Sequence, residues 1–181
     1  MGISFNLFGI FLEETEDQLA LVRWITAGLA IPGIRSLHGD AGYLLSNMIA
    51  KYSLAASQYR ISDGALGYLL EINVDLGVTH KRSKFYGKGS PLIYEHPVPA
   101  SVVRERLLKE EANEEAVRNL LRKAGPVTVL LRTEDDMLNN AGLKKSMPAN
   151  WEWGDNYFAR YQQVDIKVSD AVLHLDGKIK R

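Results

Sequence analysis

The chain has 181 residues, 46% hydrophobic and 24% charged, and its 22 lysines and arginines are balanced by 22 aspartates and glutamates. This length suits one domain with a real core, while zero net charge argues against a histone-like DNA coat, an acidic DNA mimic or a disordered tail. Because there is no cysteine, disulfide scaffolds, thiolate zinc sites, iron–sulfur clusters and cysteine nucleophiles are excluded.

The first part of the chain predicts one strand and three helices. Residues 3–12 predict a strand, and residues 17–30 predict a helix that is apolar almost all round. A second helix is expected over residues 40–59, with Asp40 as its N-cap. A third should begin after Ser62 and end at Gly77.

The second part alternates short strands and helices. Residues 77–90 predict a loop and residues 91–95 a short strand; helices are expected over 102–111 and, capped by Asn113, over 114–124. Residues 127–131 (VTVLL) predict an interior strand. Thr133 is expected to be the N-cap of the next helix, which should end at Gly142. A helix over 155–162 and a hairpin, 164–168 with 171–175, complete the pattern.

These elements predict an α+β fold, a single helix-rich domain over residues 1–181 with about seven helices and a small mixed β-sheet. We find no internal repeat, linker, signal peptide or membrane span, and expect a cytoplasmic protein. The motifs of P-loop NTPases, Rossmann dehydrogenases, zincins, kinases and α/β-hydrolases are also absent from the sequence.

The loop predicted over residues 77–90 is strongly basic. Between Gly77 and Tyr94 it carries no acid but four cations, Lys81, Arg82, Lys84 and Lys88. Cations interleaved with Phe85 and Tyr86 in a glycine-containing loop can hold phosphates and stack a base, which predicts a nucleic-acid or nucleotide partner. The alternative is a solvated loop whose aromatic residues fold back onto the core.

A Glu95-His96 pair follows this loop at the end of a short predicted strand. A histidine can act as a general base, and the carboxylate can help to hold a divalent ion such as Mg²⁺ or Mn²⁺. Residues 95–99 (EHPVP) resemble the acidic-His-x-x-Pro strand end of HNH nucleases, which implies a metal-dependent nuclease with His96 as base. That family also uses an Asn and a later His or Asn; Asn113 is available, but Leu121-Arg122 stand eight or nine residues later. The alternative is a structural His96 in the proline-rich turn.

Two further clusters have both a functional and a structural interpretation. The acids of residues 134–136 can bind Mg²⁺ at a strand end or can stabilise a helix N-terminus. The segment 151–161 holds five large aromatic residues, among them Trp151, Trp153 and Tyr157. It can stack bases, bind a protein partner or close the core.

Two functions are therefore expected in different classes. The first is a protein that binds the phosphates of a nucleic acid or nucleotide through the basic loop. If it is an enzyme, we expect a metal-dependent nuclease with Glu95 and His96 as catalytic residues. The alternative is a non-catalytic interaction or inhibitor protein that uses the aromatic segment as its hot spot.

Overall fold

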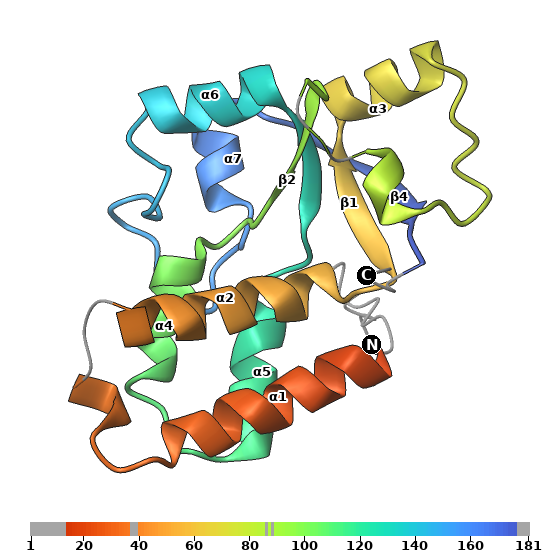
Figure 1. Cartoon of the computed structure of the whole chain (residues 1–181). Helices are drawn as coiled ribbons and strands as arrows, with labels where there is room; N and C mark the ends of the chain where they lie inside the picture. The colour runs from red at the N-terminus through yellow and green to blue at the C-terminus, as the bar shows by residue number, and fades with distance from the viewer. Residues whose placement is uncertain (1–13, 37–39, 86, 88, 177–181) are drawn as a thin grey trace, which may run out of the picture.

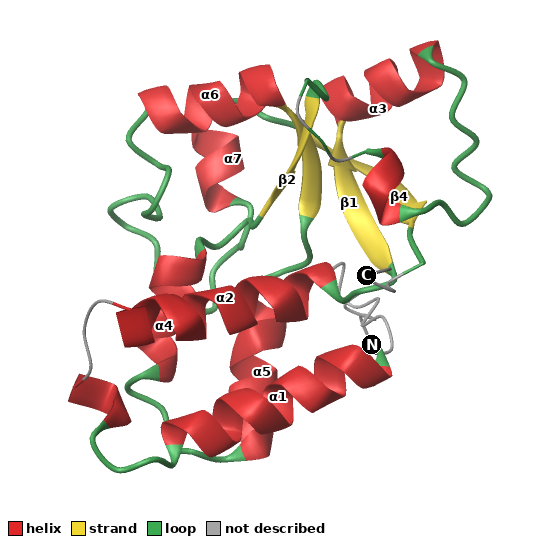
Figure 2. Ribbon diagram, viewed as in Figure 1, coloured by secondary structure: helices red, strands yellow, loops and turns green. Residues whose placement is uncertain are grey.

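A computed structural model shows an α+β fold in which helices pack on both faces and at one end of a mixed sheet (Figures 1 and 2). The structure describes residues 14–36, 40–85, 87 and 89–176, and these form seven α-helices and one four-stranded sheet. The predicted fold class is confirmed. Within the described residues, no helix is long and apolar enough to cross a membrane.

Four helices form a bundle at one end of the molecule: α1 (Glu16–Leu29), α2 (Asp40–Leu54), α4 (Ala100–Leu107) and α5 (Glu114–Lys123). Their apolar stripes meet in one core, which includes Ile25, Ile49, Val103 and Leu120. Two caps define the helix starts, since the Thr15 hydroxyl accepts from Gln18 N and the Asn113 side chain accepts from the amides of the first turn of α5.

The sheet contains β1 (Gln58–Ser62), β2 (Leu92–Glu95), β3 (Thr128–Leu131) and β4 (Val168–His174), in the order β2-β3-β1-β4. β1 and β3 run parallel, and the outer strands pair antiparallel to them. Directly paired residues share a face. Glu95, Thr128 and Arg60 therefore form a polar row across three strands on one face.

Each face of the sheet is covered by its own helices. On one face, α3 (Asp63–Glu71) and Phe85, at the end of the short 3-10 helix η2 (Arg82–Lys84), cover Tyr59, Ile61 and Val129. On the other face, α6 (Arg132–Asn140) and α7 (Ala159–Gln163) cover Leu130. A second 3-10 helix, η1 (Ile34–Ser36), follows α1.

The structure corrects two elements of the sequence prediction. The helix expected over 40–59 ends at Leu54, and Tyr59 belongs to β1, where it is fully buried in the sheet core. The predicted hairpin at the C-terminal end is wrong, because residues 168–174 form one strand that continues through Ser169-Asp170 and pairs with β1. The strand predicted over 3–12 lies outside the described residues.

Several helix boundaries also differ from the prediction. α3 ends at Glu71 instead of Gly77, and Asn73 just beyond it has a positive φ of 58°. α6 begins at Arg132, so Thr133 lies inside the helix and is not its N-cap. The last helix begins at Ala159, because residues 148–158 form turns that bring their aromatic side chains onto the core.

Candidate functional site

The basic loop lies over the sheet face that α3 covers. Lys81 and Lys84 are exposed, whereas Arg82 is half-buried with its guanidinium carbon 5.6 Å from the centre of the Tyr59 ring. The Tyr94 hydroxyl donates to the Arg82 carbonyl oxygen at 2.8 Å, which fixes η2 on β2. Lys88 and Tyr86, two further predicted site residues, lie outside the described residues.

The Arg82 guanidinium is unusual because two of its nitrogens, Nε and Nη2, are buried without a hydrogen-bond partner. These two nitrogens form the side of the guanidinium fork that binds two oxygens of a carboxylate or phosphate at once. Buried donors of this kind are normally satisfied, and an unsatisfied one costs about 1–3 kcal/mol. The fork is thus a donor pair that no group in the described structure uses.

A further cation, which the sequence analysis did not assign to the basic loop, contacts it from α6. Arg132, the first residue of α6, donates from Nε to the Ser90 carbonyl oxygen at 2.6 Å, and its backbone amide donates to Pro91 O at 2.8 Å. It reaches the loop because β2 pairs antiparallel with β3, so that Leu92 stands opposite Leu131. Only the strand pairing, which the sequence does not show, could have revealed it.

Phe85, in contrast, does not present a stacking surface. It is 3% exposed, packs edge-to-face against His80 at 5.4 Å between centroids, and belongs to the sheet core. The interpretation that the loop aromatics fold back onto the core is therefore confirmed for Phe85.

Glu95 and His96 lie at the end of β2, where Arg160 of α7 holds the chain. Arg160 is fully buried and donates to a Glu95 carboxylate oxygen and to the carbonyl oxygens of His96, Pro97 and Leu143. The Glu95 side chain is 19% exposed. Burial raises the pKa of its carboxyl, and the Arg160 charge opposes that shift.

His96 is held in a neutral form at this junction. Burial lowers the pKa of its imidazole to about 4, opposed by a hydrogen bond to the backbone of Ala50. Its Nε2 is buried without a partner. A general base works best with a pKa near the operating pH and within reach of the substrate. These contacts are those of a structural junction, and the catalytic role of Glu95 and His96 stays a prediction.

The basic loop and the Glu95-His96 pair do not share one site. Tyr94 belongs to the core on the η2 side, while Glu95 stands opposite Thr128 and contacts α7 on the other face. Neighbouring residues in a strand point to opposite faces, so the sheet separates Glu95 from the basic loop.

In the acidic cluster at the start of α6, Glu134 makes capping contacts. Glu134 Oε2 accepts from Ser62 Oγ at 2.5 Å and from Leu131 N at 2.8 Å, and so links the starts of α3 and α6. In the part of the chain that the structure describes, no three His, Asp or Glu side chains are grouped to hold a metal ion. A requirement for Mg²⁺ or Mn²⁺ stays a prediction.

The aromatic segment lies half-buried against the helical core. Trp151 and Trp153 meet edge-to-face at 5.5 Å, and they and Tyr157 pack on the bundle. Trp151 also lines an open hollow of about 610 Å³ beside α7, called here the Trp151 hollow. Of the three predicted interface residues, Trp153 and Tyr157 do not line it.

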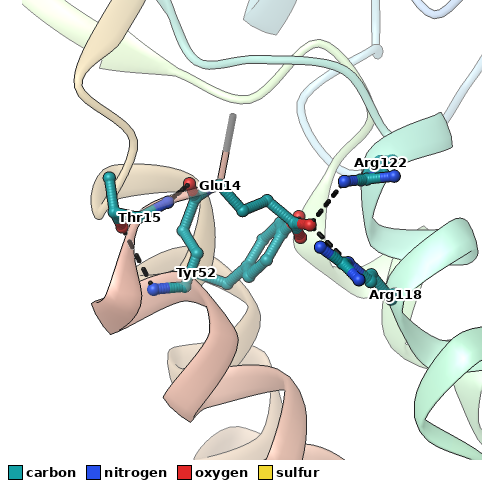
Figure 3. Close-up of polar contacts among 6 residues, drawn as sticks. Glu14, Thr15, Tyr52, Arg118 and Arg122 are labelled. Atoms are coloured by element: carbon teal, nitrogen blue, oxygen red, sulfur yellow. Dashed lines mark hydrogen bonds and ion pairs between the residues drawn. The ribbon is translucent and has the colours of Figure 1, made fainter. Parts of the chain in front are cut away.

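A buried carboxylate network joins the start of the described chain to the bundle (Figure 3). Glu14 accepts from Tyr52 Oη at 2.7 Å, from Arg122 Nη2 at 2.6 Å and from Arg118 Nε. Desolvation raises the pKa of the Glu14 carboxyl, but these hydrogen bonds and positive charges outweigh it, so its pKa is lowered. The network ties residue 14 to α2 and α5, which is a structural role.

Comparison with known proteins adds no assignment to these sites: no family model, curated protein or solved structure matches the chain.

Proposed function

We propose that this protein binds a phosphate-bearing ligand, a nucleotide or a nucleic acid, through Lys81, Arg82 and Lys84 of the basic loop and Arg132 of α6. The observation that carries the proposal is the Arg82 fork, two buried and unpartnered donors on one edge of a guanidinium. A phosphate offers two oxygens at the spacing of that edge and would satisfy both donors once the Arg82 side chain turns outward, since both nitrogens are buried in this structure.

The surrounding charges favour an anion as the ligand. In the described structure none of the four cations takes part in an ion pair, whereas Arg23, Arg60, Arg106, Arg118, Arg122 and Arg160 all do. Lys81 and Lys84 are exposed beside the fork. Such unpaired cations attract phosphate at long range, and the buried fork can orient it at short range.

The geometry gives less support to phosphodiester hydrolysis by Glu95 and His96. Glu95 lies on the opposite sheet face from the Arg82 fork and is already paired with Arg160, while His96 lies beyond the end of β2, against the backbone of Ala50 in α2. Binding is therefore the proposed function, with nuclease activity as a separate prediction whose test is the loss of metal-dependent cleavage in a folded His96→Ala variant.

The test of binding uses a labelled single-stranded oligonucleotide, a duplex of the same sequence and a nucleoside monophosphate, each titrated at several salt concentrations. The variant Lys81→Ala/Arg82→Ala/Lys84→Ala is compared with Lys109→Ala/Lys123→Ala/Lys144→Ala, which removes the same charge from exposed lysines elsewhere. If the loop contacts duplex phosphates, its variant should lower the slope of log K against log salt by about 3.

The control variant should change that slope by much less. An equal loss in both variants would show that net charge alone drives binding, and unchanged binding in the loop variant would reject the proposal. Arg82→Lys keeps the charge but removes the fork, so we expect it to weaken binding although the protein stays folded. Preference among the three ligands identifies the source of the phosphate.

A further inference from the structure

The Trp151 hollow lies on a different part of the molecule from the basic loop. The turns over residues 148–156 form one wall and the outer side of α7 forms the other. Its volume is about 610 Å³ and it is wide open to solvent, so a ligand would lie along a shallow surface with one side exposed. The side chains that matter for recognition are those of Asn150, Trp151, Asn156, Gln162 and Gln163.

Most of the side-chain amides around Trp151 are not used by the fold. Asn150, Gln162 and Gln163 are exposed, and in the described structure their side chains make no hydrogen bond within the chain. Asn156 uses its Oδ1 to accept from Phe158 N at 2.9 Å, which leaves its Nδ2 as a donor toward a ligand. The hollow therefore has a mostly apolar surface, with a few neutral amides that can donate to a ligand or accept from it.

The walls of the hollow are held in place by buried contacts. Trp151 Nε1 donates to Asn156 O at 3.1 Å, and Trp153 packs on the Trp151 ring. On the opposite wall, Arg160 anchors α7 through its buried hydrogen bonds, next to Ala159 and two residues before Gln162. A site whose walls are already ordered loses little entropy when a ligand binds.

We propose that the Trp151 hollow binds a neutral oligosaccharide. A sugar hydroxyl donates and accepts at once, as a side-chain amide does, whereas a phosphate only accepts from donors. Among the described residues that line the hollow there is no lysine or arginine, and Asp155 is the one charged residue. An indole ring supplies a flat, weakly polar surface that suits the C–H face of a sugar ring. This site goes beyond the proposed phosphate binding and does not depend on it.

The experiment follows the Trp151 indole N–H signal by NMR while the intact protein is titrated with maltotriose, cellotriose and chitotriose. A proline-rich decapeptide and inorganic phosphate are titrated in parallel. Gln162→Ala and Gln163→Ala are compared with Asn140→Ala, an exposed amide that does not line the hollow. All three are surface changes, so they should leave the melting temperature unchanged.

We expect a saturable shift of the Trp151 signal with at least one trisaccharide at millimolar concentration. Each glutamine variant should raise the dissociation constant about fivefold, the effect of one net hydrogen bond, and Asn140→Ala should leave it unchanged. The proposal is overturned if no trisaccharide shifts the signal, if the peptide or phosphate does so instead, or if the glutamine variants bind as well as Asn140→Ala.

Discussion

Arg160 shows how one buried charge can organise a junction between two parts of a fold. It has no exposed surface, and its donors reach the end of β2, the following turn and Leu143, three residues after the end of α6. A charge in the interior is tolerated only when its donors are satisfied, as they are here by Glu95 and three carbonyl oxygens. Glu95, which the sequence suggests as a catalytic residue, thus serves here as the partner of a buried arginine.

Replacing Arg160 with alanine should therefore destabilise the protein strongly. The change leaves the Glu95 carboxylate and several carbonyl groups without a partner, and breaking such buried pairs costs about 3–5 kcal/mol. Urea unfolding followed by far-UV circular dichroism measures the loss. Arg106→Ala removes a partly exposed ion pair with Glu110 and should cost less than about 1 kcal/mol; equal effects would contradict the buried role.

His96 should make stability depend on pH in a definite direction. Its pKa is lowered from 6.5 to about 4 in the folded protein, so between those values the unfolded chain binds a proton that the native chain does not. Stability should rise with pH from about 4 to 6.5 through this residue, by up to about 3 kcal/mol. His96→Asn should remove that dependence, and NMR titration of the imidazole should give a pKa near 4. A value of 6 or above would contradict the buried environment.

Among the elements, the end of α5 depends on a close contact with the aromatic segment. Gly125 has a φ of +79°, and a Cβ there would lie 2.5 Å from Tyr157 Cδ2. Glycine meets both needs, since other residues are strained at positive φ and would also displace the tyrosine ring. This contact fixes the aromatic segment on the bundle.

Gly125→Ala should thus be more harmful than the same change at Gly142. Gly142 also has a positive φ, of 75°, but a Cβ there meets nothing within 4 Å. Backbone strain alone should cost about 1 kcal/mol in Gly142→Ala, and the clash with Tyr157 should add about 1–3 kcal/mol in Gly125→Ala. Comparison of the two melting curves isolates the clash, and identical curves would show that Tyr157 moves away freely.

The sequence predicts those elements whose signals are local. Asn113 as the cap of α5 and VTVLL as an interior strand are both confirmed, because capping chemistry and β-branched runs act within a few residues. The sequence does not reveal β1, in which the polar Gln58 and Arg60 alternate with apolar residues. No glycine or proline separates this strand from the preceding helix, so the helical pattern continues into it. β4 was split at Ser169-Asp170 because turn residues there are overridden by pairing with β1.

The candidate sites were predictable only in part, for the same reason. The charge of the basic loop is visible in the sequence, but the orphaned Arg82 fork and the approach of Arg132 depend on how η2 and β3 pack. Trp151 can be recognised from the sequence as a candidate because it is a tryptophan in a segment rich in aromatic residues. The amides around it carry no motif, and only the fold brings Asn150 close to Gln162.

At the scale of the molecule, the helical bundle and the sheet have separate cores that the aromatic segment connects. Trp151, Trp153 and Tyr157 pack on the bundle, whereas Phe158 and Tyr161 pack beneath the sheet. Residues 157 and 158 are adjacent and their rings lie 4.5 Å apart. This continuity favours cooperative unfolding of both halves.

We expect a single unfolding transition as a result. Fluorescence of Trp151 and Trp153 reports on the bundle, and hydrogen exchange of the amides of β1 and β3 reports on the sheet. Both should give the same midpoint in urea. Two separate midpoints would instead divide the chain into two domains, against the prediction of one domain over residues 1–181.

The position of β4 has a consequence for the order of events during synthesis. Arg60 of β1 contacts Ser169, which is 109 residues later in the chain. While the ribosome makes the intervening segment, β1 has an open edge of unpaired amides and carbonyls that can pair with another nascent chain. A chain truncated before Val168 would keep that edge permanently, so we expect it to aggregate while the full chain stays monodisperse.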